Sequence, residues 1–170
     1  MEARWTMMPA TPADVSDLMR LIKALAAYEK LSHLVVATDS DMTQALFGIA
    51  PAAEAIMVRE GNENGPAIAF ALYFTNFSTF LGRRGLWLED LFVLPEHRGR
   101  GIGRALLEAL AATARVRGYG RFEWAVLDWN SSAIGFYERM GATILSDWKI
   151  ARVTGPALDH FGDTNPPEAG

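Results

Sequence analysis

The fold is decided by the stretch Gly85 to Gly118, which reads GLWLEDLFVLPEHRGRGIGRALLEALAATARVRG. Its first part, Leu86 to Leu94, is apolar except for two adjacent acids and ends at a proline, a pattern typical of a buried central strand. Its last part carries apolar residues at helical spacing, at Ile102, Leu106, Leu107 and Leu110. The stretch therefore predicts a strand, a glycine-rich loop and an amphipathic helix, in that order.

This order of elements predicts an anion site at the loop. The first turn of a helix has unpaired backbone N–H groups and a partial positive charge, and glycines let a ligand approach that backbone closely. Arg98, Arg100 and Arg104 add positive charge, and no acid lies between His97 and Leu107. A pyrophosphate across this turn would meet both kinds of donor. The alternative is a surface loop whose arginines are only solvated.

Two common phosphate loops do not match this stretch. A mononucleotide loop needs Gly-x-x-x-x-Gly-Lys followed by Ser or Thr, and the chain has no such run. A dinucleotide loop needs Gly-x-Gly-x-x-Gly, whereas the glycines here are spaced Gly-x-Gly-x-Gly. Its ribose-binding acid would also end the next strand, and Glu123 lies inside that predicted strand. The loop therefore belongs to a different class.

The pattern Arg-x-x-Gly-x-Gly from Arg98 to Gly103 resembles the acetyl-CoA loop of the GNAT superfamily of N-acetyltransferases. In that family the loop amides hold the coenzyme pyrophosphate, so the resemblance implies acetyl-CoA as cofactor and coenzyme A as product. It also implies that Asn130 contacts the pantetheine arm, although Asn130 would equally serve as a helix cap. The expected coenzyme-binding residues are Leu91, Phe92, Val93, Arg98, Gly99, Arg100, Gly101, Ile102, Gly103, Arg104 and Asn130.

Further motifs resemble the diamine (spermidine/spermine) N-acetyltransferase branch of this superfamily. They are Leu88-Glu89-Asp90, Phe92-Val93, Trp129-Asn130, Phe136-Tyr137 and, near the start, Tyr28-Glu29. The resemblance implies a GNAT fold of the α/β (α+β) class, with a mixed, mostly antiparallel central sheet splayed at the acetyl-CoA site and flanked by helices. It also implies a homodimer.

The chain is predicted to form one N-acetyltransferase domain over residues 4–153, followed by a loosely ordered tail over 154–170. Its 170 residues suffice for a single sizeable core. Strands are predicted at 4–8, 55–59, 67–76, 86–94, 121–128 and 143–153. Helices are predicted after a cap at Thr11, over Asp39 to Phe47 after a cap at Thr38, from Ile102 to Gly118 and from Ser131 to Met140.

Composition excludes several classes of function. A net charge of −4 argues against a nucleic-acid-binding surface. The chain has no cysteine, so acetyl transfer through a cysteine is excluded. Its three histidines lie apart from any acid cluster at metal spacing, so no metal site is expected. No apolar stretch reaches membrane-spanning length and the first residues lack a signal-peptide core, so we expect a cytoplasmic protein without membrane contact.

Glu89 is the predicted catalytic base. Neutralising an alkyl amine of pKa about 10.4 at physiological pH costs about 4 kcal/mol, so a base must take its proton. Glu89 lies in an apolar strand where desolvation should raise its pKa, and the diamine branch has a glutamate with this role. The alternative is a structural salt bridge to a nearby Arg or Lys. Strand alternation predicts that Asp90 points to the opposite face.

Tyr137 is the predicted catalytic acid, because a phenol can donate a proton to the departing thiolate of the coenzyme. This position matches the tyrosine that serves as general acid in many members of the superfamily. The alternative is a tyrosine that only packs in the core.

Residues on the substrate side follow from the resemblance alone. It implies that Glu29 and Asp90 lie near a cationic substrate and that Trp148 lies near the subunit contact. Residues 154–170 contain no lysine, unlike the tail of the polyamine enzymes, and the approach to Trp148 is shorter. The expected reaction is direct acetylation of a primary amine of a small polyamine or a thialysine-like amino acid. A non-catalytic acyl-CoA-binding module and an acetyltransferase for a protein or antibiotic amine remain alternatives.

Overall fold

The computed structural model describes residues 5–159 and residue 161. The chain forms two compact units, Met1–Leu127 and Asp128–Gly170. Arg4, with which the predicted domain and first strand begin, lies outside the described residues, as do residues 160 and 162–170 of the predicted tail.

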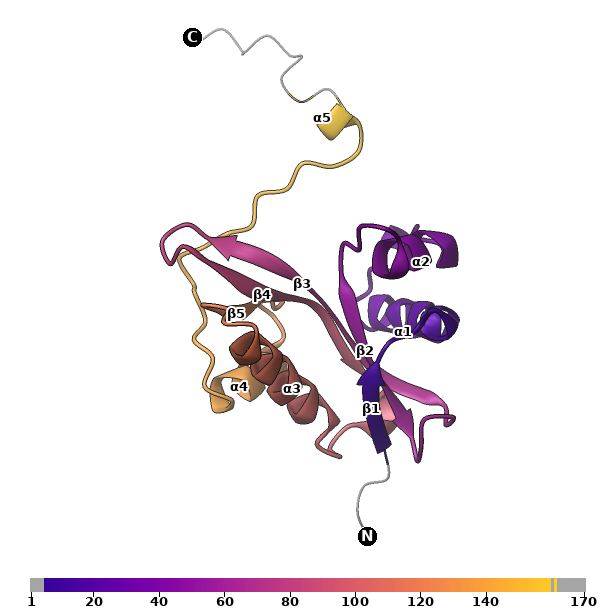
Figure 1. Ribbon diagram of the computed structural model, residues 1–170. Helices are drawn as coiled ribbons and strands as arrows, with labels where there is room; N and C mark the ends of the chain where they lie inside the picture. The colour runs from indigo at the N-terminus through magenta and orange to yellow at the C-terminus, as the bar shows by residue number, and fades with distance from the viewer. Residues whose placement is uncertain (1–4, 160, 162–170) are drawn as a thin grey trace, which may run out of the picture. The chain divides into compact units, whose positions relative to one another are not determined.

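One five-stranded sheet forms the centre of the first unit (Figure 1). Its strands follow the order β1-β2-β3-β4-β5, and all neighbours are antiparallel except β4 and β5, which are parallel. The prediction of a mixed, mostly antiparallel sheet is therefore confirmed. The strands are β1 (Trp5–Pro9), β2 (Glu54–Glu60), β3 (Ala67–Ser78), β4 (Arg83–Val93) and β5 (Phe122–Trp124).

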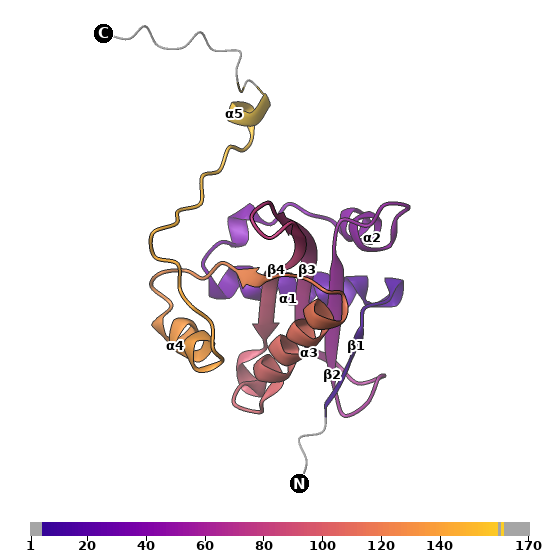
Figure 2. The same cartoon turned by 60° about the vertical axis from the view of Figure 1, so that its left-hand side comes forward.

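Helices cover both faces of this sheet. Figures 1 and 2 show α1 (Val15–Tyr28) and α2 (Asp39–Phe47) on one face and α3 (Ile102–Val116) on the other. Both predicted caps are present, because Asp14 and Asp41 accept hydrogen bonds from Thr11 and Thr38 respectively. Short 3-10 turns precede α1 at Pro12–Asp14, follow it at Ser32–Leu34 and lead into the glycine loop at Pro95–His97.

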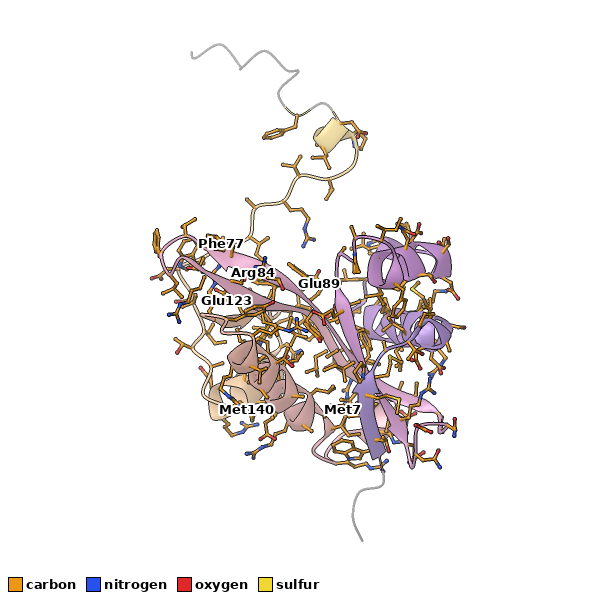
Figure 3. The ribbon with its side chains drawn as sticks, in the orientation of Figure 1. Met7, Phe77, Arg84, Glu89, Glu123 and Met140 are labelled. Carbon is orange, nitrogen blue, oxygen red and sulfur yellow. The ribbon has the colours of Figure 1, made fainter. Side chains whose placement is uncertain are left out.

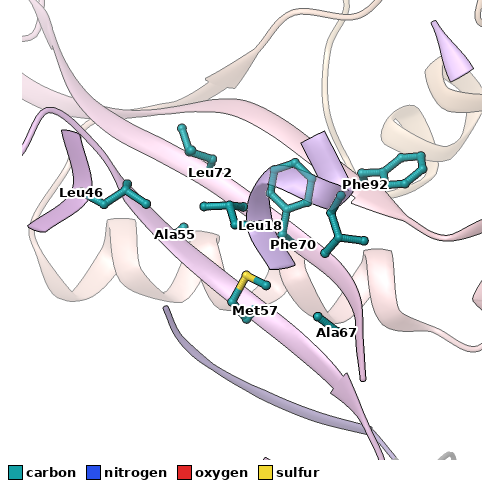
Figure 4. Packing of buried hydrophobic residues seen from close by; sticks show 9 residues of the cluster. Leu18, Leu46, Ala55, Met57, Ala67, Phe70, Leu72 and Phe92 are labelled. Atoms are coloured by element: carbon teal, nitrogen blue, oxygen red, sulfur yellow. The ribbon is translucent and has the colours of Figure 1, made fainter. Parts of the chain in front are cut away.

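The hydrophobic core lies between the sheet and the two helices α1 and α2 (Figure 4). Alternate residues of β2, β3 and β4 point into it, as the two-residue period of a strand requires. The cluster consists of Leu18, Leu21, Leu46, Ala55, Met57, Ala67, Phe70, Leu72 and Phe92. On the opposite face, α3 buries the predicted stripe of Ile102, Leu106, Leu107 and Leu110. The glycine loop is thus held between two packed elements, β4 and α3.

A β-bulge interrupts the pairing of β3 with β4. Leu72 pairs with Asp90 and Tyr73 pairs with Leu88, so Glu89 is an extra residue without an opposing partner in β3. On its other side, β4 pairs with β5 only over Leu86–Leu88. The parallel pairing therefore ends just before the bulge, at the place where the family resemblance implied a splay.

The second unit contains α4 (Ser131–Arg139) and a single turn, α5 (Pro156–Asp159). Asn130 caps α4 by accepting from the backbone of Ala133 at 3.2 Å, and Gly141 follows the helix with a φ of +94°. None of the helices within the described residues has the length and apolar character needed to cross a membrane.

Two of the predicted strands differ from the structure. The strand predicted over 121–128 forms only at Phe122–Trp124, and the strand predicted over 143–153 is absent. A strand needs hydrogen bonds to a neighbour, and apolar residues in a row do not supply that neighbour. The apolar side chains of the second segment are exposed instead: Ile144, Leu145, Trp148, Ile150 and Val153.

Candidate functional site

The glycine loop between β4 and α3 has an open backbone. Gly99 and Gly101 adopt left-handed conformations, with φ angles of +75° and +78°. A side chain at either position would meet no heavy atom within 4 Å, so the space above the loop is free of protein. The glycines therefore allow both the turn itself and a close approach by a ligand.

The first turn of α3 has the features of an anion site. Its N-cap is Gly101, which has no side chain to pair with the exposed N–H groups, and no acid lies in the first turn. Gly103 packs within 3.8 Å of Leu91 Cδ2 and 4.0 Å of Val93 Cγ2, measured from an ideal Cβ position. The turn is thereby fixed against the end of β4, and its unpaired donors suit a pyrophosphate.

The strand edge before the loop is open as well. Among the described residues, β5 pairs with β4 no further than Leu88, which leaves Leu91, Phe92 and Val93 without a neighbour on that side. Unpaired backbone groups at such an edge can bond an extended ligand arm. The glycines, the uncapped turn and the open edge thus fit a long coenzyme with a phosphorylated end.

The three loop arginines, which were predicted to add positive charge at the loop, all have protein partners. The Nε of Arg98 donates to the carbonyl of Val93 at 3.1 Å, and its guanidinium lies 4.6 Å from the centre of the Tyr28 ring and 5.7 Å from that of Phe92. Arg104 forms an exposed pair with Glu108 at 2.8 Å. Arg100 donates to Glu60 at 3.1 Å and to His97 at 2.7 Å. Their contribution to a pyrophosphate site therefore stays a prediction.

Glu89 and Asp90 lie on the same face of the sheet, which corrects the prediction of opposite faces. Asp90 is paired with Leu72 and Trp87 with Phe74, and these two β3 residues share a face because they are two apart. The indole N–H of Trp87 donates to Glu89 Oε2 at 3.0 Å, which places Glu89 on that face too (Figure 3). The bulge causes this, because the extra residue shifts the alternation by one.

The two acids differ in their surroundings. Glu89 is exposed, so the prediction that its strand desolvates it is wrong. No ion pair of Glu89 with Arg or Lys occurs among the residues that the structure describes, so the salt-bridge alternative is not observed either.

Asp90 is the desolvated acid of this strand. Burial, followed by the negative charges of Glu89 and Glu29, raises the pKa of Asp90 to about 6. Burial also raises the pKa of Glu29, which follows the last residue of α1. The structure thus brings Glu29, Glu89 and Asp90 together as an acidic cluster. Such a cluster attracts a cation.

The remaining predicted residues belong to the second unit. Asn130 caps α4, as predicted for one of its two roles. Tyr137 lies on the same helix, half-buried, with its ring 5.5 Å from that of Phe136. Trp148 is 79% exposed. Asn130 and Tyr137 therefore belong to the same helix, α4, as its N-cap and as a residue on it.

Three side chains next to the predicted site were missed from the sequence. Tyr28 contacts Arg98, while Glu60 and His97 hold Arg100. The motif Tyr28-Glu29 indicated the first of these, but nothing in the sequence marks Glu60, which is 40 residues from its partner.

The two cavities of the first unit lie away from the predicted site residues. Two cavities of about 440 Å³ lie in the first unit, and neither is lined by a predicted site residue. Within residues 5–159 and 161, no group of three or more His, Cys, Asp or Glu side chains could hold a metal ion.

Comparison with known proteins agrees with this arrangement. Residues 18–142 match the model of the acetyltransferase (GNAT) family. The chain is 33% identical to L-ornithine N5-acetyltransferase of Arabidopsis thaliana, over 92% of this chain and 87% of that protein. It is 35% identical to thialysine N-epsilon-acetyltransferase of Mus musculus, over 88% of this chain and 92% of that protein.

A solved structure shares the fold. An integron cassette protein from the mobile metagenome of V. cholerae superposes with a TM-score of 0.77 at 23% identity, covering 95% of this chain and 99% of that one. The family match spans the central strand, the glycine loop and α4, and the two relatives align over nearly their whole length. The chain therefore belongs to the GNAT family of acetyltransferases.

Proposed function

We propose that this enzyme transfers the acetyl group of acetyl-CoA directly to the side-chain amine of a small basic amino acid. The observation that carries the proposal is the acidic cluster of Glu29, Glu89 and Asp90, which lies at the β-bulge directly before the coenzyme loop. A cationic acceptor held there would be next to the splayed edge of β4. The names of the relatives, an ornithine and a thialysine acetyltransferase, support an amino acid as acceptor.

The coenzyme would be held by the loop and by the open strand edge. The backbone N–H groups of Ile102, Gly103 and Arg104 form the first turn of α3 and suit the pyrophosphate. Leu91 to Val93 would bond the extended arm along β4, and Asn130 would add a contact from the cap of α4. When bound, acetyl-CoA supplies a thioester that a neutral amine can attack.

The two neighbouring acids would have different roles: Asp90 would bind the amine and Glu89 would remove its proton. Asp90 is partly buried and is charged above a pH of about 6, so it would bind the ammonium form of the acceptor. Glu89 is exposed and can pass a proton to water. Since Glu89 Oε2 accepts a hydrogen bond from Trp87, its other oxygen, Oε1, would take the proton of the amine.

Tyr137 would complete the reaction by giving its hydroxyl proton to the departing sulfur. A phenol is a weak acid that can donate a proton to a thiolate. Because the chain has no cysteine, no acetyl-cysteine intermediate stands between donor and acceptor. The transfer would thus be direct.

The proposal favours amino acids over polyamines because of the C-terminal sequence. Residues 154–170 contain no lysine, which departs from the tail of the polyamine enzymes that the chain otherwise resembles. A homodimer would cover the exposed apolar residues between Ile144 and Val153, of which Trp148 is the largest. Both assignments are tested below.

Steady-state kinetics of two variants test the separate roles of Glu89 and Asp90. We expect Glu89→Gln to lower kcat by about 100-fold or more with little change in the KM of the amine, as for loss of a general base. We expect Asp90→Asn to raise the KM of the amine more than it lowers kcat, since it removes a binding charge. A Glu89→Gln variant with wild-type kcat would refute Glu89 as the base.

Tyr137→Phe tests the general acid. The substitution keeps the ring that lies against Phe136 and removes only the hydroxyl. We expect kcat to fall by about 100-fold with unchanged affinity for coenzyme A. An unchanged kcat would leave Tyr137 as a packing residue.

A further inference from the structure

The side chain of Arg100 is anchored at one corner of its guanidinium. Its Nη1 donates to Glu60 Oε1 at 3.1 Å and to His97 Nδ1 at 2.7 Å. Because a guanidinium can only donate, Nδ1 of His97 must be the acceptor, and the neutral ring then carries its proton on Nε2. The side chains of His97, Arg100 and Glu60 are 14%, 30% and 43% exposed, so the contact with His97 is the more shielded of the two.

The rest of the guanidinium is unoccupied. In the part of the chain that the structure describes, Nε and Nη2 of Arg100 have no hydrogen-bond partner. These two N–H groups form an edge of the guanidinium that can bind a phosphate through two parallel hydrogen bonds. Arg100 is thus fixed at one corner and free along one edge, within the coenzyme loop.

The other loop arginines are bound differently. Arg98 uses its Nε for the carbonyl of Val93, so its corresponding edge is already taken. Arg104 pairs with Glu108 one turn later on its own helix, and both side chains are more than half exposed. Among these three arginines, Arg100 alone is anchored to a side chain of β2.

The anchor on β2 is itself firmly held. The backbone N–H of Glu60 donates to the carbonyl of Pro66 at 2.9 Å across the turn between β2 and β3. Arg59 closes the same turn by donating to the carbonyl of Gly65 at 2.8 Å, and it also binds Asp14 and Asp17 at the start of α1. Glu60 therefore stands on a turn that is tied to the core.

We propose that Glu60 and His97 position Arg100 as a phosphate ligand of the coenzyme. The inference rests on the proposed function, because it requires the loop to bind acetyl-CoA. A free arginine side chain loses much rotational freedom when it binds an anion, and a pre-anchored one loses less. Glu60 also carries a negative charge that would by itself repel a phosphate. By positioning Arg100, Glu60 would strengthen coenzyme binding, whereas its negative charge would weaken it. Experiment can separate these two effects.

Calorimetric binding of coenzyme A to the full-length protein tests the inference, with the melting temperature of each variant measured alongside. Glu60→Ala removes both anchor and charge, and we expect the Kd to rise by about 5- to 10-fold. Glu60→Gln keeps an acceptor oxygen, and we expect a Kd within about twofold of the wild type. At the second anchor, His97→Asn keeps an acceptor near the place of Nδ1 and should bind normally, whereas His97→Leu should bind more weakly.

A double-mutant cycle measures the coupling between Glu60 and Arg100 in the Kd of coenzyme A. A purely structural role of Glu60 would give no such coupling. On an Arg100→Ala background, Glu60→Ala should no longer raise the Kd, because there is no longer a side chain to position and only the repulsive charge of Glu60 is removed. Tighter binding by both Glu60 variants would overturn the inference and show that Glu60 only neutralises the loop. So would an unchanged Kd in Arg100→Ala. If the wild-type protein bound no coenzyme A, the proposed function would fail as well.

Discussion

The carboxylate of Asp90 is partly buried near two other carboxylates, so its negative charge is costly in the folded protein. Burial and the charges of Glu89 and Glu29 raise its pKa from the usual 3.8 to about 6. The folded state therefore binds a proton more tightly than the unfolded state. Stability from this group is fully present below pH 3.8 and is lost as the pH rises through 6.

Replacing Asp90 by asparagine should therefore stabilise the protein at pH 8. A pKa change from 3.8 to about 6 corresponds to at most about 3 kcal/mol, and partial access of water should leave about half of it. Urea unfolding of Asp90→Asn and wild type at several pH values measures the difference. It should be largest above pH 7 and vanish near pH 4. A less stable variant at pH 8, or a difference independent of pH, would show that Asp90 is not desolvated.

Sequence reasoning located the residues of the site but not their orientation. It singled out Glu89 and Asp90, and the strand and loop around them are confirmed. It placed the two acids on opposite faces, because a regular strand alternates and nothing in the residues announces a bulge. Likewise it identified Arg100 but not Glu60, since that contact joins segments 40 residues apart.

Among the elements, the turn that joins β4 to α3 depends on backbone conformation more than on side chains. Gly101 has a φ of +78° and Gly118, at the other end of α3, has a φ of +68°. Neither would bring an added Cβ within 4 Å of another atom. The two glycines are thus matched in backbone strain, but only Gly101 lies over the first turn of the helix.

Gly101→Ala and Gly118→Ala should therefore destabilise the protein equally but differ in coenzyme binding. A non-glycine residue in this region costs about 1–2 kcal/mol, which thermal melting should detect in both variants. We expect Gly101→Ala to weaken coenzyme A binding by about 10-fold or more, because its methyl group enters the space left for the phosphate. Gly118→Ala should bind with wild-type affinity. Equal affinities of the two variants would mean that the ligand does not approach Gly101.

The helix whose apolar residues recur at helical spacing was predicted well. The strands that need a neighbouring strand for their hydrogen bonds were not. The helix from Ile102 begins at the predicted residue because its apolar spacing and its preceding glycines are local. The strand predicted over 143–153 rested on apolar content alone, and no neighbouring strand pairs with it among the described residues. The length of β5 was overestimated for the same reason.

At the scale of the whole molecule, the second unit carries several exposed apolar side chains. Its exposed apolar residues include Trp129, Ile144, Leu145, Trp148 and Ile150. Exposed apolar side chains that gather in one patch are typical of a protein–protein interface. This surface agrees with the homodimer that we propose.

Light scattering should accordingly give about twice the chain mass of 18.7 kDa. We expect Trp148→Glu to shift the protein toward the monomer, because a charge buried in an apolar contact is unfavourable. Val116→Glu provides the control, since Val116 is also exposed but lies at the end of α3. A monomeric wild-type protein at every concentration would exclude the dimer.

The most direct test of the acetyltransferase assignment is coenzyme A release from acetyl-CoA, followed with a thiol-reactive dye. The chain contributes no thiol of its own, so the background is low. The acceptors to compare are ornithine, thialysine, lysine, putrescine, spermidine and spermine. We predict turnover with the amino acids at a higher kcat/KM than with the polyamines. Higher kcat/KM for the polyamines would contradict the substrate class, and no turnover with any of these amines, despite binding of coenzyme A, would contradict the central claim.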